Sequence, residues 1–107
     1  MSAPLNDATT ALLRAVRAML ESAARFVVEE VRSRSWASVT FSGARHELAF
    51  RLEGDGAEDA AARFVAGLEA AEFPLRGHIV ADIALVREER RAGCARLRIE
   101  ALTVEDD

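Results

Sequence analysis

Two histidines, His46 and His78, and one cysteine, Cys94, have the side chains best suited to proton transfer, metal binding or nucleophilic attack in this 107-residue chain. Histidine titrates near neutral pH, and a cysteine thiolate is a strong nucleophile. The histidines do not occur in an H-x-x-x-H or H-E-x-x-H spacing. A single cysteine cannot form an internal disulfide or a cysteine-based zinc cluster. We therefore expect no metal, no cofactor and no catalytic residue.

His46 lies in the alternating segment "RHELAFRLE", where it shares a face with Leu48, Phe50 and Leu52. Successive side chains of a strand point to opposite faces, so His46 is expected on the side of the sheet that faces the core. No carboxylate is in phase with it. We interpret His46 as a histidine at the rim of the core, at the end of a hairpin.

His78 and Asp82 are four residues apart in a second alternating segment. On one face of a strand that spacing separates them by about 13 Å, too far for direct contact. His78 is expected on the uncovered face, opposite to His46, so the two cannot share a metal. Cys94 is expected at a hairpin end near Arg96, with no histidine close enough to act as its base.

Charge and composition exclude several classes of partner. The net charge is −4, whereas nucleic-acid binding needs a concentrated basic surface. The glycines of "EGDGAED" do not match a phosphate-binding loop. No apolar segment approaches the roughly 20 residues that span a membrane, and the N-terminus lacks the pattern of a signal peptide. We expect a cytoplasmic protein that binds neither nucleic acid nor membrane.

Apolar residues at helical spacing predict a first helix from about Thr9 to Arg34. Its apolar residues cover an arc of roughly 200°, wider than the stripe a surface helix buries. Two alternating runs follow, "WASVTFS" and "RHELAFRLE". A two-residue loop at Gly43-Ala44 would make them a hairpin that pairs Phe41 with His46 and Val39 with Leu48.

A second helix is expected from about Ala57 to Ala71, with Asp55 and Glu58 as a capping box and Pro74 as its stop. The last third predicts another hairpin. Its loop is Arg91-Ala92-Gly93, with Gly93 left-handed, which sets Leu85 opposite Ile99 and Glu88 opposite Arg96. A bulge is expected near Ala101, where the alternation breaks.

These elements predict one α+β domain over residues 1–107, a two-layer sandwich in the order α-β-β-α-β-β. We expect a four-stranded antiparallel sheet with strand order 2-1-3-4 and both helices on one face. Residues 1–7 and 105–107 are expected to be flexible. This element order is common to many families, so it identifies none.

The function favoured by the sequence is a homodimeric binding or adaptor module that uses its first helix or its open sheet face. The wide apolar arc of the helix suggests one contact surface. The uncovered sheet face suggests another, because it carries the tryptophan and is flanked by the charged residues Arg51, Arg96, Arg98 and Glu100. The candidate interface residues are Leu12, Met19, Phe26, Trp36, Val80, Asp82 and Val86.

Two alternatives remain open. One is a small ligand-binding domain or enzyme with a pocket between sheet and helices, for which the polar candidates are His46, His78, Arg51 and Arg98. The other is a subunit of a hetero-oligomeric complex, because an exposed apolar arc would also suit a different protein partner.

Overall fold

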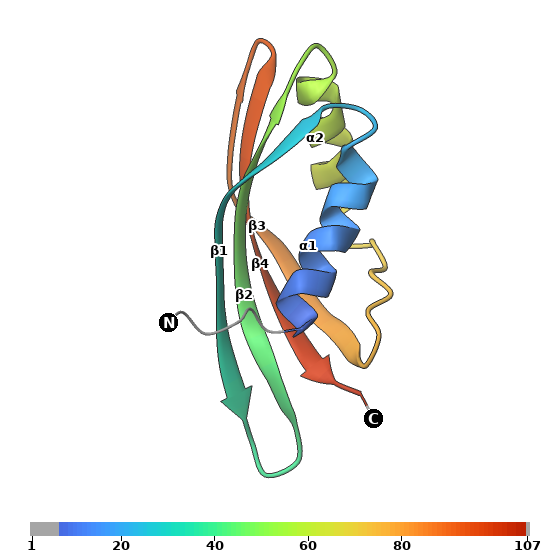
Figure 1. Ribbon diagram of the computed structural model, residues 1–107, viewed down its shortest axis with the longest axis vertical. Helices are drawn as coiled ribbons and strands as arrows, with labels where there is room; N and C mark the ends of the chain where they lie inside the picture. The colour runs from blue at the N-terminus through green and yellow to red at the C-terminus, as the bar shows by residue number, and fades with distance from the viewer. Residues whose placement is uncertain (1–6, 107) are drawn as a thin grey trace.

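The computed structural model describes residues 7–106 and has the predicted order of elements. Figure 1 shows both helices on the same face of a four-stranded antiparallel sheet. The α-β-β-α-β-β order and the two-layer α+β class are therefore confirmed. The elements are α1 (Asp7–Leu20), β1 (Arg25–Ala37), β2 (Ser42–Glu53), α2 (Ala57–Gly67), β3 (His78–Arg91) and β4 (Cys94–Glu105).

The predicted strand order 2-1-3-4 is wrong, since the order in the sheet is β1-β2-β4-β3. The two hairpins meet through their second strands, so β2 and β4 are central. These two strands have the most regular burial of alternate residues, and a central strand has a neighbour on each side to cover it. Their core-facing residues are Ala44, His46, Leu48, Phe50 and Leu52 in β2, and Ala95, Leu97, Ile99, Ala101 and Thr103 in β4.

The first helix ends at Leu20, so the expected helix to Arg34 is wrong, and residues 25–37 form an edge strand. The run "RFVVEEV" is rich in β-branched and aromatic residues, which favour strands. A bulge between Val28 and Glu30 adds one residue to the strand. It changes the spacing of the apolar positions from two to three, which resembles helical periodicity.

The β1–β2 turn lies at Ser38–Phe41, not at Gly43-Ala44. The N–H of Ser38 donates to the carbonyl of Phe41 (2.7 Å), and the N–H of Phe41 donates to Ser38 Oγ (3.0 Å). His46 consequently pairs with Ser33 rather than Phe41. Gly43 is inside β2, where a Cβ would lie 1.9 Å from the carbonyl oxygen of Thr103. The glycine permits close approach of β4 there.

The β3–β4 hairpin has Gly93 at φ 75° and Leu85 opposite Ile99, as predicted. The expected three-residue loop is wrong, because Arg91 pairs with Cys94 and only Ala92 and Gly93 form the turn. Arg96 therefore faces Glu89 instead of Glu88, and a bulge after Leu85 restores the predicted pairing of Leu85 with Ile99. The bulge expected near Ala101 is wrong, because the burial of β4 alternates without interruption. The bulge at this level of the sheet belongs to β3 and lies between Val80 and Asp82.

Helix α2 ends at Gly67, earlier than Ala71, and begins after Gly56 without a side-chain cap. The expected Asp55–Glu58 capping box is therefore wrong, because the helix starts one residue too late for Asp55 to cap it.

Aromatic rings link the sheet to the helices. Phe26 stacks on Phe50 with ring centroids 4.9 Å apart, and Phe50 meets Phe64 of α2 edge-to-face at 5.9 Å. Most of the ends expected to be flexible, residues 1–6 and 107, lie outside the described part. Asp106 donates its N–H to Gly77. No helix within residues 7–106 is long and apolar enough to cross a membrane.

Candidate interaction surface on the uncovered sheet face

The face of the sheet opposite the helices, here called the outer face, consists of rows of side chains that follow the strand pairing. Each row crosses β1, β2, β4 and β3 in that order. The rows are Trp36, Gly43, Val104, Ile79; Arg34, Arg45, Leu102, Asp82; Arg32, Glu47, Glu100, Ala84; Glu30, Ala49, Arg98, Arg87; Val27, Arg51, Arg96, Glu89; and Arg25, Glu53, Cys94, Arg91.

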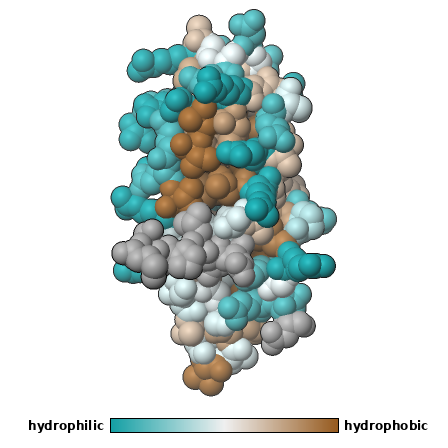
Figure 2. All heavy atoms as spheres, in the orientation of Figure 1, coloured by the Kyte–Doolittle hydropathy of each residue, from teal (hydrophilic) through white to brown (hydrophobic). Residues whose placement is uncertain are grey.

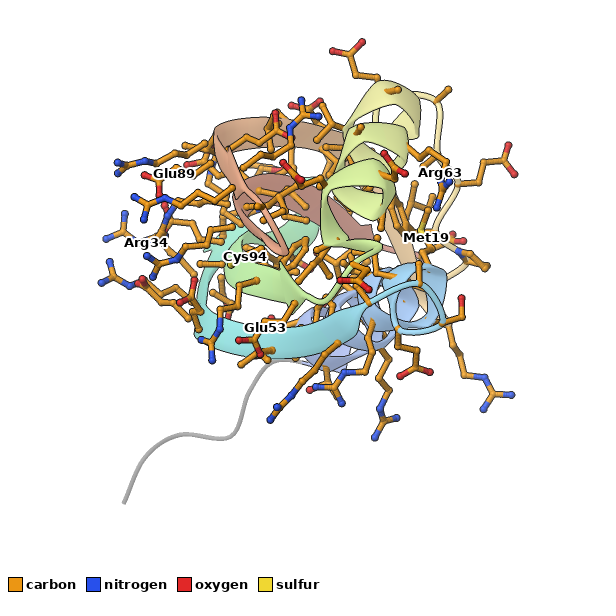
Figure 3. The ribbon with its side chains drawn as sticks, turned by 90° about the horizontal axis from the view of Figure 1, so that it is seen from above. Met19, Arg34, Glu53, Arg63, Glu89 and Cys94 are labelled. Atoms are coloured by element: carbon orange, nitrogen blue, oxygen red, sulfur yellow. The ribbon has the colours of Figure 1, made fainter. Side chains whose placement is uncertain are left out.

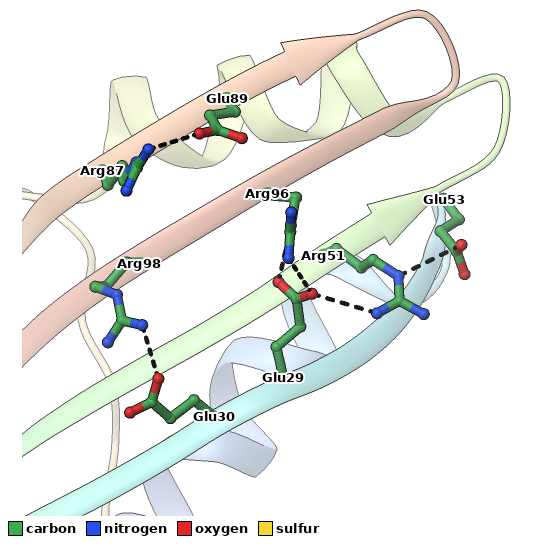
Figure 4. A network of polar contacts seen from close by, with 8 residues as sticks. All are labelled: Glu29, Glu30, Arg51, Glu53, Arg87, Glu89, Arg96 and Arg98. Atoms are coloured by element: carbon green, nitrogen blue, oxygen red, sulfur yellow. Dashed lines mark hydrogen bonds and ion pairs between the residues drawn. The ribbon is translucent and has the colours of Figure 1, made fainter.

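Ion pairs connect the rows that contain Glu30 and Arg51, toward the end of the sheet away from the β1–β2 turn (Figure 4). Arg51 and Arg96 are cross-strand neighbours of like charge, and Glu29 in the β1 bulge lies between them. Arg96 donates to both oxygens of Glu29, Nε at 3.2 Å and Nη2 at 2.7 Å, and Arg51 donates at 3.4 Å. The bond from Arg96 is the main cause that lowers the pKa of Glu29.

Glu30, the next residue, accepts a hydrogen bond from Arg98 at 2.8 Å and forms an ion pair with Arg32. The bond from Arg98 lowers the pKa of Glu30 and raises that of Arg98. The bulge places two consecutive glutamates on one face, which regular alternation would not allow. This end of the outer face is therefore nearly neutralised within the chain.

The two rows that begin with Arg34 and Arg32 line a groove of about 500 Å³. Arg34 and Arg45 are direct cross-strand neighbours there, and so are Glu47 and Glu100. Like charges directly opposite each other destabilise a sheet. Within residues 7–106, none of these four side chains, nor Asp82, forms a hydrogen bond or ion pair. The groove therefore carries charges of both signs that no ion pair within residues 7–106 neutralises, although Arg98 attracts Glu47 and Glu100 without a direct hydrogen bond.

An apolar end adjoins the groove. Ile79 is 52% exposed, and in the turn of the β1–β2 hairpin Phe41 is 58% exposed and Val39 is fully exposed. Figure 1 shows that this hairpin extends beyond the helix layer, and Figure 2 shows an apolar tip at the same end. The indole Nε1 of Trp36 is buried and lacks an acceptor among the described residues.

His46 is 1% exposed and lies between two threonines. Its Nδ1 is 2.8 Å from Thr9 Oγ1 of α1, and its Nε2 is 2.8 Å from Thr103 Oγ1 of β4. Thr103 donates its hydroxyl proton to the carbonyl of Ala44, so it accepts from Nε2–H and the Nδ1 atom accepts from Thr9. Burial, and secondarily the charge on His78, lowers the pKa of His46. His46 is a neutral core residue that ties α1 to the sheet.

His78 does not lie where the sequence predicted. The bulge before Asp82 shifts the alternation, so that His78 is on the helix-covered face with Val80, and its Nδ1 donates to the carbonyl of Arg76 at 3.1 Å. The expectation that the two histidines face opposite sides is wrong. Among residues 7–106, no group of three or more histidine, cysteine, aspartate or glutamate side chains could hold a metal ion.

The first helix does not present the wide exposed apolar surface that we expected. Leu12 is fully buried and Phe26 packs against the core from β1, so neither extends an exposed helical stripe, whereas Met19 is 49% exposed. Val80 also packs against the core, while Asp82 and Val86 are exposed. Of the seven candidate interface residues, Trp36 and Asp82 occupy rows of the outer face.

Sequence reasoning placed Arg51, Arg96, Arg98 and Glu100 on the uncovered face, and the strand pairing agrees. It missed Arg34, because that residue was assigned to a helix. It also missed Thr9 and Thr103 as partners of His46. The alternation in "VEEVRSRSW" would have placed Arg34 in a strand. The contact between Thr9 and His46 joins residues 37 positions apart, so no local pattern indicates it.

The chain was compared with known proteins. No protein-family model matches it, and no curated protein matches it. Among solved structures, a chain from the virion of a native gene transfer agent particle aligns with a TM-score of 0.59 at 18% sequence identity. The alignment covers 94% of this chain and 94% of that chain. At this level of identity the similarity shows the fold alone.

Proposed function

We propose that this chain is a non-catalytic subunit of a multi-protein particle and that its outer face contacts neighbouring subunits there. The observation that carries the proposal is the structural similarity to a chain of a gene transfer agent virion, which extends over 94% of both chains. The similarity therefore involves nearly the whole two-layer fold and not one part of it.

The distribution of charge supports the outer face as the contact surface. Like-charged neighbours, Arg34 with Arg45 and Glu47 with Glu100, destabilise the isolated chain. A partner with complementary charges would relieve this repulsion, and complementary charges also direct how two proteins dock. The exposed apolar side chains beside the groove, Ile79 and Phe41, would add apolar contact area.

The sheet edges suit contact less well than the outer face does. An edge strand can pair with another chain through its free backbone groups, and bulges are one means by which proteins prevent this. Both edge strands have bulges, one in β1 and two in β3, whereas the pairing of the central strands β2 and β4 is regular. The face is thus the better candidate.

The geometry supports an enzyme less well. His46 is sealed in the core with both ring nitrogens occupied by threonines. The groove offers arginines to an anionic ligand, but Glu47, Asp82 and Glu100 line the same groove and would repel it.

The experiment is a density-gradient fractionation of lysed cells that produce the chain with an epitope tag. We expect the chain to sediment with particles visible by electron microscopy, far ahead of the free protein. Arg45→Glu should reduce the share in the particle fraction, while Arg63→Glu, the same charge change on exposed α2, should not. Finding all of the wild-type chain at the top of a gradient that contains particles would contradict the proposal.

A further inference from the structure

Most of the unpaired charges of the groove are separated by sign across the sheet. The row that contains Arg34, Arg45, Leu102 and Asp82 is cationic on β1 and β2 and anionic on β3. In the next row Glu100 adds a negative charge on β4. None of these four charged side chains forms an ion pair within residues 7–106. Apart from Glu47 on β2, the β1–β2 half of the groove is therefore positive and the β4–β3 half negative, so that the two halves are electrostatic complements.

A surface with this property can pair with a second copy of itself. Consider two outer faces packed together and related by a two-fold axis that runs along the strands between β2 and β4. The rotation exchanges the β1 side of one copy with the β3 side of the other and keeps each row opposite the same row. Arg34 of each copy then lies opposite Asp82 of its partner, twice by symmetry.

We propose that the partner of the outer face is a second copy of this chain, bound face to face with reciprocal Arg34–Asp82 contacts. The inference rests on the proposed function, because it names one neighbour in the particle. Two sheets packed with nearly aligned strands, about 10 Å apart, are a common arrangement. Side chains as long as arginine can bridge that distance.

The neighbouring rows fit the same arrangement. In the next row, Glu47 of one copy lies opposite Glu100 of the other, and the two carboxylates repel each other. Arg45, one row away, lies near the same Glu100 and offsets this repulsion. The apolar row with Trp36, Val104 and Ile79 packs on its own symmetry mate, so the 52% exposed Ile79 side chain becomes covered. The self-neutralised rows around Glu29 form the other end of the contact.

Sedimentation velocity of the full chain at low ionic strength tests the pairing. We expect a dimer for the wild-type chain that dissociates as salt is raised, because exposed charges are screened. Arg34→Glu and Asp82→Arg should each raise the dissociation constant by about tenfold or more, since each replaces two attractive contacts with two repulsive ones. Both side chains are exposed, so circular dichroism should show unchanged folding.

A mixture of the two variants is the decisive measurement. In a heterodimer of the Arg34→Glu chain with the Asp82→Arg chain, both symmetry-related contacts are again between opposite charges. We expect dimerisation to return in the mixture and not in either variant alone. The control is Arg63→Glu, which changes the same charge on the opposite side of the molecule and should dimerise like the wild-type chain (Figure 3).

A wild-type chain that stays monomeric at low salt, or a mixture that stays as monomeric as its components, would overturn the pairing. Either result would leave the particle proposal standing if the chain still sediments with particles, because a different subunit would then occupy the outer face. A dimer in solution combined with absence from particles would instead overturn the proposed function alone.

Discussion

A single buried histidine links three elements of this protein. His46 in β2 contacts Thr9 of α1 on one side and Thr103 of β4 on the other, and its neutral form satisfies both hydroxyls. Protonation would convert the nitrogen that accepts from Thr9 into a donor and would place a charge in the core. The contact is therefore expected to depend on pH.

The stability of the chain should fall as pH decreases below about 6.5. His46 has a lowered pKa in the folded protein, mainly because of burial, whereas in the unfolded chain it takes up a proton near pH 6.5. The unfolded state then binds more protons, and the free energy of unfolding decreases by at most about 1.4 kcal/mol per pH unit until the folded pKa is reached. Urea denaturation between pH 7.5 and 5.5 measures the slope. His46→Gln should flatten it and His78→Gln should keep most of it; equal slopes for wild type and His46→Gln would contradict this.

Replacing Thr103 by valine should destabilise the protein by about 1–3 kcal/mol, because it leaves the Nε2–H of His46 buried without an acceptor. Thermal or urea unfolding measures the loss. Thr40→Val makes the same chemical change in the exposed β1–β2 turn and should alter stability by less than about 0.5 kcal/mol. Equal effects for the two variants would show that the hydroxyl of Thr103 contributes little.

At the scale of elements, Gly43 sets how closely β2 and β4 approach. A Cβ at this position would lie 1.9 Å from the Thr103 carbonyl and 3.0 Å from the Trp36 ring, so the backbone must shift. Gly43→Ala is expected to cost about 1–3 kcal/mol, the usual range for overpacking. Gly67→Ala has open space and should be neutral or slightly stabilising. Equal unfolding midpoints for the two variants would refute this close approach.

The bulges explain how much of this architecture the sequence could predict. The β3–β4 hairpin was predicted with its Leu85–Ile99 pairing, because turn chemistry and alternation are local signals. The bulges at Glu29 and Ala81 add one residue each. The first makes the spacing of apolar residues in β1 resemble that of a helix. The second makes simple alternation assign His78 to the wrong face of the sheet. Local signals could not predict the strand order either. The order depends on which strands become central, with a neighbouring strand on each side, and that is decided by contacts between distant parts of the chain. The outer face was thus predicted in part, through Arg51, Arg98 and Asp82, and without its β1 residues.

At the scale of the whole molecule, the β1–β2 hairpin extends beyond the helices and exposes Val39 and Phe41 at its tip. The double variant Val39→Ser with Phe41→Ser should leave stability within about 0.5 kcal/mol, because neither side chain is buried. We expect it to lower the share of the chain found in the particle fraction, measured on the density gradient. Met19→Ser removes a similarly exposed apolar side chain from the helix side and serves as control. A larger loss for Met19→Ser would move the contact to the helices.

The row at the hairpin end also contains an optical probe. Trp36 is the chain's one tryptophan, and the chain contains no tyrosine. Its half-buried ring lies beside Gly43 in the apolar row of the outer face. Near-ultraviolet fluorescence of the unlabelled protein therefore comes almost entirely from this row. Occupation of the outer face should shift its emission to shorter wavelength, so a titration in a cuvette can follow docking without a dye.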